Sequence, residues 1–322
     1  MIAPSLSWAT GAPLVIFSGR SDRFVKPVLE QFTAKTGILT VLHTGSSTAL
    51  LNKLQLEGAR SEADLYISND AGNLQAGSDM GLFKPMTANL YNSVPANLHA
   101  GDGSWVGLSA RARVLVVNTN AKDVDFVQSV FDLADPRLKG KLAITNSSNE
   151  SYIAGVTVYL ESAGVEKTRQ WLDAVKANVA GEVFNKHSQI VRAVAQGKKS
   201  VGLVNHYYIY RHLDQHPAAP IRIVMPDQGK AGMGVAWNVA GAAIAKHSKN
   251  VGAAEQLLAF LLSVEGQKTF AEANREYPVR PGVAAASQIP AAGSFRIADV
   301  PMSALGKQRN ATLDLIEQLG MP

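Results

Sequence analysis

Cysteine is absent from this chain of 322 residues, and its absence excludes several kinds of chemistry. A chain without thiols forms no disulfide bond, iron–sulfur cluster or thiolate zinc site, and it has no cysteine nucleophile. Long apolar runs are missing too, because no stretch approaches the roughly 18–20 apolar residues that a membrane-spanning helix needs. Aromatic side chains are scarce, with only 8 tyrosines in the chain, so any cluster of them needs an explanation.

A concentrated charge of one sign is also lacking. The formal net charge is +5 and the pI is near 9.3, but the basic residues are scattered. The densest clusters are "RAR", which holds Arg111 and Arg113, and "GKKS", which holds Lys198 and Lys199. Neither cluster has the charge density or the interleaved aromatics of a nucleic-acid groove, so we expect no nucleic-acid partner.

The first residues, "MIAPSLSWATGAPLVIFSGR", do not combine a positively charged segment with a following apolar segment, as a secretory signal does. Two alternatives follow from this. Either the protein stays in the cytoplasm, or an export signal has been removed and a start methionine supplied. Composition does not decide between them.

Patterns of strand and helix alternate along the chain. Its length exceeds the size at which one hydrophobic core usually stops growing, so we expect two lobes. Apolar runs at 14–17, 38–43 and 63–68 predict strands, separated by amphipathic helices that end at Gly37 and Gly58. The same pattern returns with strands at 112–118, 141–146 and 200–205. Strand–helix–strand units imply an α/β fold with parallel sheets, and two lobes without a linker imply more than one crossing of the chain.

Polar turns follow the expected strands, and they read "SGRSD", "GSS", "SND", "NSSNESY" and "NHYY". Ligands of open α/β sheets bind at the carboxyl ends of strands, often on helix N-termini. We therefore expect these turns to converge on one cleft between the lobes, with Ser18 and Asn69 among the residues that line it.

The stretch "VNHYYIYR" holds Tyr207, Tyr208 and Tyr210. Neighbouring strand residues point to opposite faces, so the adjacent pair cannot pack against one core unless the strand ends before it. We expect the strand to end at Asn205 and both phenols to enter the cleft from irregular backbone, while Tyr210 serves packing. One interpretation is an aromatic cluster with satisfied hydroxyls. The other is a ligand set for Fe³⁺, because only a strong Lewis acid holds a phenol deprotonated at neutral pH.

Seven segments favour the second interpretation by their order along the chain: "VIFSGRSDRFVKPVLEQFTAKTGI", "LNKLQLEGARSEADLYISNDAGNL", "WVGLSARARVLVVNT", "LADPRLKGKLAI", "VAQGKKSVGLVNHYYIYR", "AGAAIAKHSKN" and "NREYPVRPGV". Together they resemble the bacterial periplasmic ferric iron-binding proteins of ABC importers. The resemblance implies a type II periplasmic-binding-protein fold, transferrin-like, with two α/β lobes, two hinge strands and a closing cleft. The first lobe is expected at 12–110 plus 237–287 and the second at 111–236 plus 288–322.

The resemblance also implies which tyrosines bind the metal. Tyr207 and Tyr208 match the adjacent tyrosine ligands of the family, and Tyr152 matches the third tyrosine that one subgroup adds from the same lobe. We expect Tyr152 at the start of a helix, where free amide groups and the helix dipole also suit an anion. His206 is the competing ligand, but at the end of a strand it would point away from Tyr207.

Basic residues implied by the resemblance would hold a synergistic anion, such as carbonate or bicarbonate. They are Arg20 and Arg111, with Arg113 as the alternative to Arg111, because a strand points the two the same way. The sequence also departs from the family. Ile16 and Phe17 stand where many members have a His or Tyr ligand, and Asn69 stands where others have a Glu. An all-tyrosine set from the second lobe, completed by anion or water, is therefore expected.

The resemblance implies that the protein captures Fe³⁺ and delivers it to an inner-membrane ABC permease. The protein is expected to be a monomer that is periplasmic or exported, either free or lipid-anchored. The alternative is the same fold carrying an oxyanion, a polyamine or an organic acid. An enzyme or a regulatory domain would need a nucleophile, an acid–base pair or a DNA-binding segment. None is found in the sequence, so we predict that the protein is not an enzyme.

Overall fold

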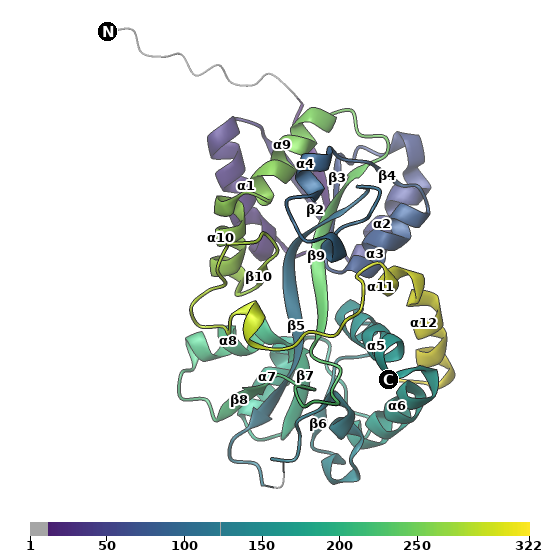
Figure 1. The fold of residues 1–322 in the computed structure, drawn as a ribbon, viewed down its shortest axis with the longest axis vertical. Helices are drawn as coiled ribbons and strands as arrows, with labels where there is room; N and C mark the ends of the chain where they lie inside the picture. The colour runs from purple at the N-terminus through teal and green to yellow at the C-terminus, as the bar shows by residue number, and fades with distance from the viewer. Residues whose placement is uncertain (1–11, 123) are drawn as a thin grey trace.

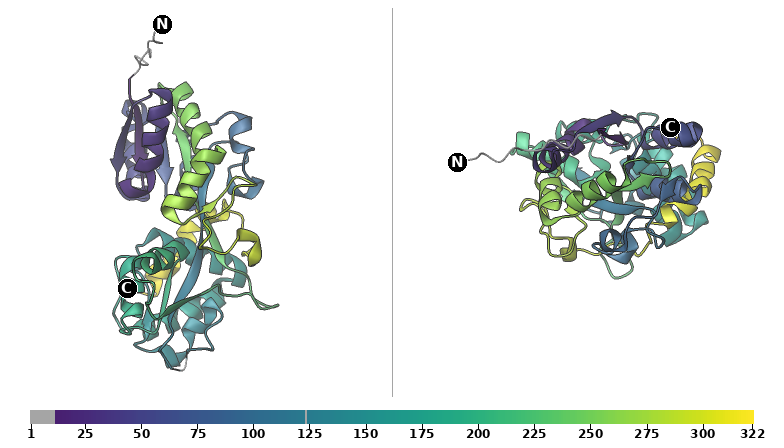
Figure 2. Two further views of the ribbon diagram at one scale, coloured as in Figure 1. Left: turned by 90° about the vertical axis from the view of Figure 1, so that its left-hand side faces the viewer. Right: turned by 90° about the horizontal axis from the view of Figure 1, so that it is seen from above.

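Two lobes joined by long strands make up the fold, seen in a computed structural model that describes residues 12–122 and 124–322. Figure 1 shows the lobes one above the other, with strands β5 and β9 running between them. The side view in Figure 2 shows the same division. The predicted bilobal α/β fold is confirmed.

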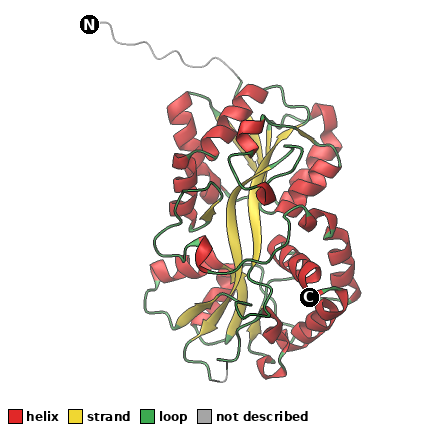
Figure 3. Ribbon diagram, viewed as in Figure 1, coloured by secondary structure: helices red, strands yellow, loops and turns green. Residues whose placement is uncertain are grey.

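The first lobe holds the N-terminal part of the chain and a later return of it. Its strands are β1 (Leu14–Ser18), β2 (Thr40–Thr44), β3 (Leu65–Ser68) and β4 (Phe83–Lys84). Its helices are α1 (Asp22–Thr36), α2 (Ser47–Glu57), α3 (Ala71–Asp79), α4 (Ala88–Tyr91), α9 (Val251–Leu261) and α10 (Val264–Asn274). Figure 3 shows these helices on both sides of the strands.

The second lobe repeats this arrangement. Its strands are β6 (Leu142–Ala143), β7 (Val201–Asn205) and β8 (Ile221–Val224). Its helices are α5 (Glu150–Ala163), α6 (Val165–Val179), α7 (His187–Ala195) and α8 (His206–Gln215). The chain ends with α11 (Ala304–Lys307) and α12 (Arg309–Gln318). Short 3-10 helices lie at Gly58–Arg60, Ala96–Leu98, Val130–Ala134, Pro136–Leu138 and Ala292–Ser294.

Strands β5 (Val106–Asn118) and β9 (Ala236–Ala245) connect the lobes and change partners along their length. The first part of β5 pairs with β9 and with β10 (Tyr277–Pro278), whereas its last part pairs with β7 and β8. The far end of β9 pairs with β3. All ten strands thus join one curled sheet, whose main order is β2-β1-β3-β9-β5-β7-β6.

The predicted lobe boundaries at 110/111 and 236/237 fall inside these two connecting strands. The C-terminal segment contacts both lobes, because α11 packs against α3 while α12 packs against α5. The exact division of the chain into lobes stays a prediction.

Helix α1 shows how the sequence pattern produces the first lobe. Its apolar face, Phe24, Val25, Val28, Leu29 and Phe32, is buried as the spacing predicts. The helix ends at Gly37, whose φ of 74° places it in the left-handed region. This conformation suits glycine, and the N–H of Gly37 donates to the carbonyl oxygen of Thr33. None of the helices in the described ranges is long and apolar enough to cross a membrane.

The turn after β1 places side chains at the carboxyl end of the sheet. A Cβ atom added to Gly19 would lie 2.0 Å from Ser47 Oγ, so only glycine lets this turn approach the start of α2. Ser18 stabilises the turn with two hydrogen bonds. Its hydroxyl donates to the carbonyl oxygen of Arg20 at 3.0 Å and accepts from the Arg20 N–H at 3.1 Å. The turn therefore presents Arg20 and the residues after it to the space between the lobes.

The backbone at the tyrosine pair differs from the prediction. Strand β7 does end at Asn205, but helix α8 begins directly at His206, so the expectation of irregular backbone was wrong. The strand-to-helix switch explains the pair in another way. Neighbours on a helix lie about 100° apart rather than on opposite faces, so Tyr207 and Tyr208 can share one side of the first turn.

Candidate functional site

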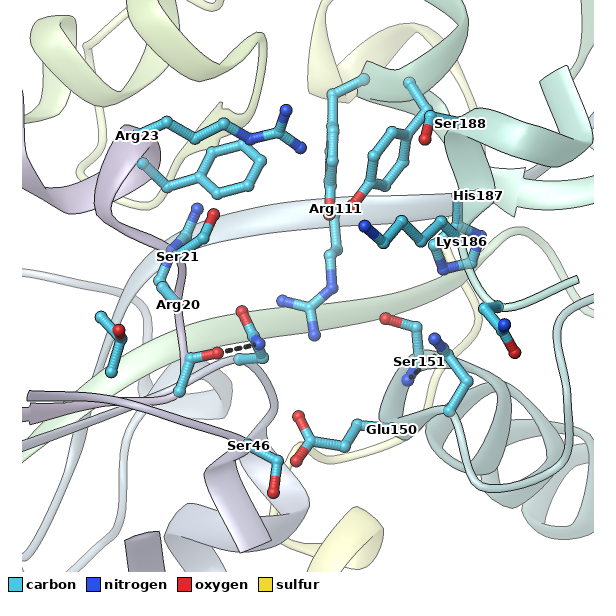
Figure 4. A pocket seen from close by; sticks show the side chains of 18 of the residues that line it. Arg20, Ser21, Arg23, Ser46, Arg111, Glu150, Ser151, Lys186, His187 and Ser188 are labelled. Carbon is cyan, nitrogen blue, oxygen red and sulfur yellow. Dashed lines mark hydrogen bonds between the residues drawn. The ribbon is translucent and has the colours of Figure 1, made fainter. Parts of the chain in front are cut away.

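A cleft of about 930 Å³ lies between the lobes, and Figure 4 shows it from close by. Residues of the first lobe form one wall and residues of the second lobe form the other. The lining residues are Gly19, Arg20, Ser21, Asp22, Arg23, Phe24, Thr44, Gly45, Ser46, Asn69, Arg111, Ser148, Asn149, Glu150, Ser151, Asn185, Lys186, His187, Ser188, Tyr207 and Tyr208. The predicted convergence of the polar turns is thus observed.

Both adjacent tyrosines face this cleft from the first turn of α8. Their ring centroids are 4.5 Å apart. Tyr207 is held on one side by an edge contact with Phe24 of the first lobe, with ring centroids 6.0 Å apart, and its hydroxyl accepts from Asn205 Nδ2 at 3.3 Å. Tyr208 packs on the ring of His187 at 5.1 Å. Two phenols are therefore held side by side in one wall.

The electrostatics of this turn favour a neutral phenol until a cation arrives. Burial raises the pKa of Tyr208, and Tyr207 raises it further. The N-terminal dipole of α8 acts in the opposite direction, because it favours negative charge in the first helical turn. No side chain caps this helix end. A strongly charged hard cation could displace the phenolic protons, whereas a weak Lewis acid could not.

Metal binding at the cleft would depend on these tyrosines. Within residues 12–122 and 124–322, no group of three or more His, Asp or Glu side chains could hold a metal ion. His206, the competing ligand, is fully buried and both ring nitrogens are engaged. Nδ1 accepts from the N–H of Ala112 at 3.2 Å, and Nε2 donates to the carbonyl oxygen of Arg275 at 2.8 Å. His206 therefore belongs to the packing between the lobes.

Tyr152, the predicted third ligand, lies in the first turn of α5 as expected but behind the wall of the cleft. It is 1% exposed, and its hydroxyl has no hydrogen-bond partner. The neighbouring residue Ser151 faces the cleft instead. The expected free amide groups of this helix are already capped, because Asn149 Oδ1 accepts from the N–H groups of Ser151 and Tyr152 at 3.1 and 3.2 Å.

Arg20 lines the cleft, but its charge is already neutralised. Its Nη2 donates to both carboxylate oxygens of Glu276 at 2.7 and 2.8 Å, and its Nη1 donates to Ser109 Oγ at 3.0 Å. Both partners of this ion pair are buried. Ser18 is buried under the turn and is not among the lining residues, whereas Asn69 lines the cleft and donates its amide to the carbonyl oxygen of Gly19.

Arg111 and Arg113 differ from Arg20 in having no carboxylate partner. Both come from β5 and point the same way, as predicted, and both are 4% exposed. Figure 4 shows the Arg111 guanidinium between the two walls. Among the described residues, neither side chain takes part in an ion pair. Arg111 can therefore give its charge to an anion in the cleft.

A contact between the lobes closes one edge of the cleft. The N–H of Thr48, in the first turn of α2, donates to Glu150 Oε1 from α5 at 3.1 Å. Arg309 adds a hydrogen bond from its Nη2 to Thr48 Oγ1 at 3.3 Å. Burial and the nearby carboxylate of Asp70 raise the pKa of Glu150. The first lobe thus docks a helix N-terminus on a carboxylate of the second.

Sequence reasoning predicted the turn that holds Glu150 but did not name Glu150 itself, and it did not place Arg23, Lys186 or His187 at the cleft. Each lies at or next to the start of a helix that follows a polar turn. That position was the available signal, because it places side chains at the carboxyl end of the sheet. Burial lowers the pKa of His187 well below its usual range, and Arg113 lowers it further, so the ring is neutral.

The sequence of this chain is similar to those of known proteins. Residues 28–296 match the family model described as bacterial extracellular solute-binding protein. The chain is 32% identical to iron uptake protein A2 of Synechocystis over 282 residues. The aligned region covers 85% of this chain and 82% of that protein.

Solved structures agree with this assignment. A Trichodesmium protein in complex with iron and citrate ligands has a TM-score of 0.85 and 31% identity, over 97% of this chain and 100% of that one. Iron-bound HitA from Pseudomonas aeruginosa has a TM-score of 0.90 and 27% identity over the same shares. These relatives are binding and transport proteins rather than enzymes. The chain belongs to the bacterial extracellular solute-binding protein family, and its resemblance to the ferric iron-binding members is confirmed.

Proposed function

We propose that the protein captures ferric iron in the cleft through the phenolates of Tyr207 and Tyr208. The observation that carries this proposal is the side-by-side placement of two phenols in the first turn of α8. Phenolate is a hard anionic oxygen ligand, and Fe³⁺ is acidic enough to hold it deprotonated. Named relatives that bind or take up iron support the same cargo.

The remaining coordination positions are proposed to be filled by oxygen atoms of a synergistic anion or of water. Arg111 lines the cleft, is buried and forms no ion pair among the described residues, so we assign the anion to it first. Carbonate suits the position beside two phenolates, and a similar Trichodesmium protein has been solved in complex with iron and citrate ligands, so a larger carboxylate is an alternative anion. Arg20 contributes less, because Glu276 already neutralises it.

Tyr152 remains a proposed third ligand, and its buried hydroxyl sets the condition. The first turn of α5 would have to rotate for this phenol to reach the cleft, because Ser151 now occupies the facing position. A Tyr152→Phe variant tests the assignment. If Tyr152 binds iron, the charge-transfer band shifts and weakens; an unchanged band means that the site uses two phenolates.

Delivery to an inner-membrane ABC permease follows from the proposed cargo, and we propose a monomer that acts in the periplasm or after export. Closing contacts such as Thr48 with Glu150 join the lobes when the cleft is occupied, and release requires protonation, reduction or loss of the anion.

One absorption experiment tests the ferric proposal directly. Iron-free protein is titrated with ferric citrate, with and without bicarbonate, and the visible spectrum is recorded. Tyrosinate-to-iron charge transfer should give an orange-red band that saturates at one iron per chain. A protein that stays colourless while ferric iron is in excess contradicts the proposal.

A second candidate keeps the fold but removes the metal. The guanidinium of Arg111, which has no carboxylate partner among the described residues, would also suit an oxyanion or an organic acid alone. Calorimetric titration of iron-free protein with citrate, phosphate and bicarbonate separates the two. Tight binding of a metal-free anion together with a colourless ferric titration would establish this alternative.

A further inference from the structure

A second and much smaller cavity lies behind the floor of the cleft, where β5, β9 and α5 meet. Its volume is about 10 Å³, and Arg111, Arg113, Ser151, Gly155 and Asn238 are among the residues that border it. Arg111 and Ser151 also line the main cleft, so the two spaces share one wall.

Unpartnered N–H groups from three buried side chains surround this cavity. They are Nη2 of Arg111, Nε and Nη2 of Arg113, and Nδ2 of Asn238, and none has a hydrogen-bond partner. The orientation of the Asn238 amide is fixed, because its Oδ1 accepts from the N–H groups of Ala71 and Val239 at 3.1 and 2.7 Å. Buried donors are almost always paired, and the side-chain oxygens of Ser151 and Asn205 at this cavity already accept other hydrogen bonds, so these donors lack an acceptor.

The charge around the cavity is equally unbalanced. Arg113 reaches Asn205 Oδ1 at 3.4 Å and the ring nitrogens of His187 at 3.3 Å, and it contacts the phenol of Tyr159; none of these groups is a carboxylate. Tyr152 and Tyr159 are the nearest groups that could oppose its charge, but they are phenols rather than carboxylates, so neither supplies a counter-charge at neutral pH. A buried cation without a counter-charge costs several kcal/mol, and here Arg111 adds a second one.

We propose that this cavity binds a small monatomic anion, chloride, as the counter-ion of Arg111 and Arg113. The volume is close to the roughly 10–15 Å³ that one water molecule needs, so carbonate and carboxylates are too large, whereas chloride, which is larger than water, needs the bordering side chains to move apart slightly. A water molecule could accept from the donors but would leave both charges in place. The site is separate from the anion position in the cleft, and it does not depend on iron.

One consequence does rest on the proposed function. The shared wall places two guanidinium groups directly behind a site for a trivalent cation. Their charges would oppose the entry of Fe³⁺, and a buried monoanion reduces that opposition. Chloride would thus allow Arg111 to orient a synergistic anion without the full repulsion of the arginine pair.

Thermal unfolding of the full, iron-free chain tests the site. The melting temperature is compared in 100 mM sodium chloride and in sodium gluconate of equal ionic strength. The gluconate anion is too large for the cavity. Chloride should raise the Tm by about 2–4 °C if it binds at millimolar affinity. Equal melting temperatures in the two salts would overturn the proposal.

Three variants locate the effect. A Cβ atom on Gly155 would lie 3.6 Å from Tyr159 Oη and 3.7 Å from Arg113 Nε, both ordinary contacts. Gly155→Ala should therefore fold with all charges intact, narrow the cavity and lose most of the chloride shift. Arg113→Met should lose it entirely. Arg222→Met removes a partly exposed arginine of β8 and should keep the full shift. Retention of the shift in both cavity variants would place chloride elsewhere and contradict the assignment.

Crystals soaked in bromide give a direct readout. An anomalous peak bordered by Arg111, Arg113 and Asn238 is expected, and a water molecule alone at that position refutes the inference. The ferric titration separates a failure of this inference from a failure of the proposed function. Loss of the chloride effect with the orange-red band intact removes only this inference, while a colourless protein with a chloride shift removes only the ferric proposal.

Discussion

The two walls of the cleft are built from similar strand–turn–helix units, but they differ in chemistry. The first-lobe wall presents hydroxyls, an amide, the guanidiniums of Arg20 and Arg23 and the carboxylate of Asp22, but no phenol or imidazole. The second-lobe wall presents Tyr207, Tyr208 and the ring of His187. One lobe therefore supplies the proposed metal ligands, and the other contributes positive charge and contacts that accompany closure. Four substitutions can break or sharpen this difference.

Removing a phenol from the second wall should have the largest effect on ferric binding. Tyr208→Phe takes away one of two proposed phenolates while keeping the ring that packs on His187. We expect the apparent ferric affinity to fall at least about 100-fold, since even outer-shell partners of metal ligands contribute 10–100-fold. The charge-transfer band should nearly vanish in a ferric citrate titration.

Tyr210→Phe is the matched control, because Tyr210 belongs to the same helix but does not line the cleft. It should keep both the band and the affinity. If Tyr208→Phe binds ferric iron as strongly as the wild type, the second wall does not hold the metal and the contrast between the walls disappears.

The second prediction concerns the first wall and measures stability. Glu276→Gln leaves Arg20 buried without a full counter-charge, so the free energy of unfolding should fall by about 3–5 kcal/mol. Urea denaturation measures the loss. The double variant Arg20→Met with Glu276→Met removes both charges and should recover most of the stability. A single variant as stable as the wild type would mean that this ion pair is solvated rather than buried.

Sequence patterns predicted the fold of this protein better than its side-chain partners. Apolar spacing identified α1 and its end at Gly37, because burial of one face and a left-handed terminus leave local signals. The end of β7 at Asn205 was also predicted. The backbone after it was not, since the argument for an adjacent pair considered only strand and irregular conformations, and a helix resolves it equally well.

Partners distant in sequence explain what could not be predicted. Glu276 lies 256 residues after Arg20 in the sequence, yet it neutralises Arg20 in the fold. Tyr152 was placed correctly at the start of α5, but which of two neighbouring residues faces the cleft depends on the rotation of the helix. Local patterns fix where a residue stands in its element, whereas a rotation or a pairing is decided by tertiary packing.

The third prediction adds a second carboxylate to the first wall. Asn69→Glu places a carboxylate in the cleft opposite the tyrosines, at the cost of the hydrogen bond to the carbonyl oxygen of Gly19. We expect a gain in ferric affinity of about tenfold, equivalent to about 1.4 kcal/mol, in a competition titration against citrate. Asn69→Gln is the neutral control, and an equal gain in both variants would show that the charge is irrelevant.

The smallest effect should come from the contact that joins the two walls. Glu150→Gln keeps an acceptor for the N–H of Thr48 and removes a carboxylate whose pKa is raised by burial and by Asp70. A raised pKa means that the folded state holds the proton more tightly than the unfolded state. Wild-type stability should therefore decline as the pH rises from about 4.5 through the raised pKa of Glu150.

In the Gln variant this part of the decline should be absent, because nothing titrates at position 150. Urea denaturation between pH 4 and 8 measures the free energy of unfolding of the wild type and of the Gln variant. The two values should separate as the pH rises, by less than about 1 kcal/mol, because only a single contact at the edge of the cleft differs. Arg309 opposes the shift of Glu150, so Arg309→Met should widen the separation from the Gln variant. Parallel curves for wild type and variant would indicate that the carboxylate is solvated, and that the two walls meet without it.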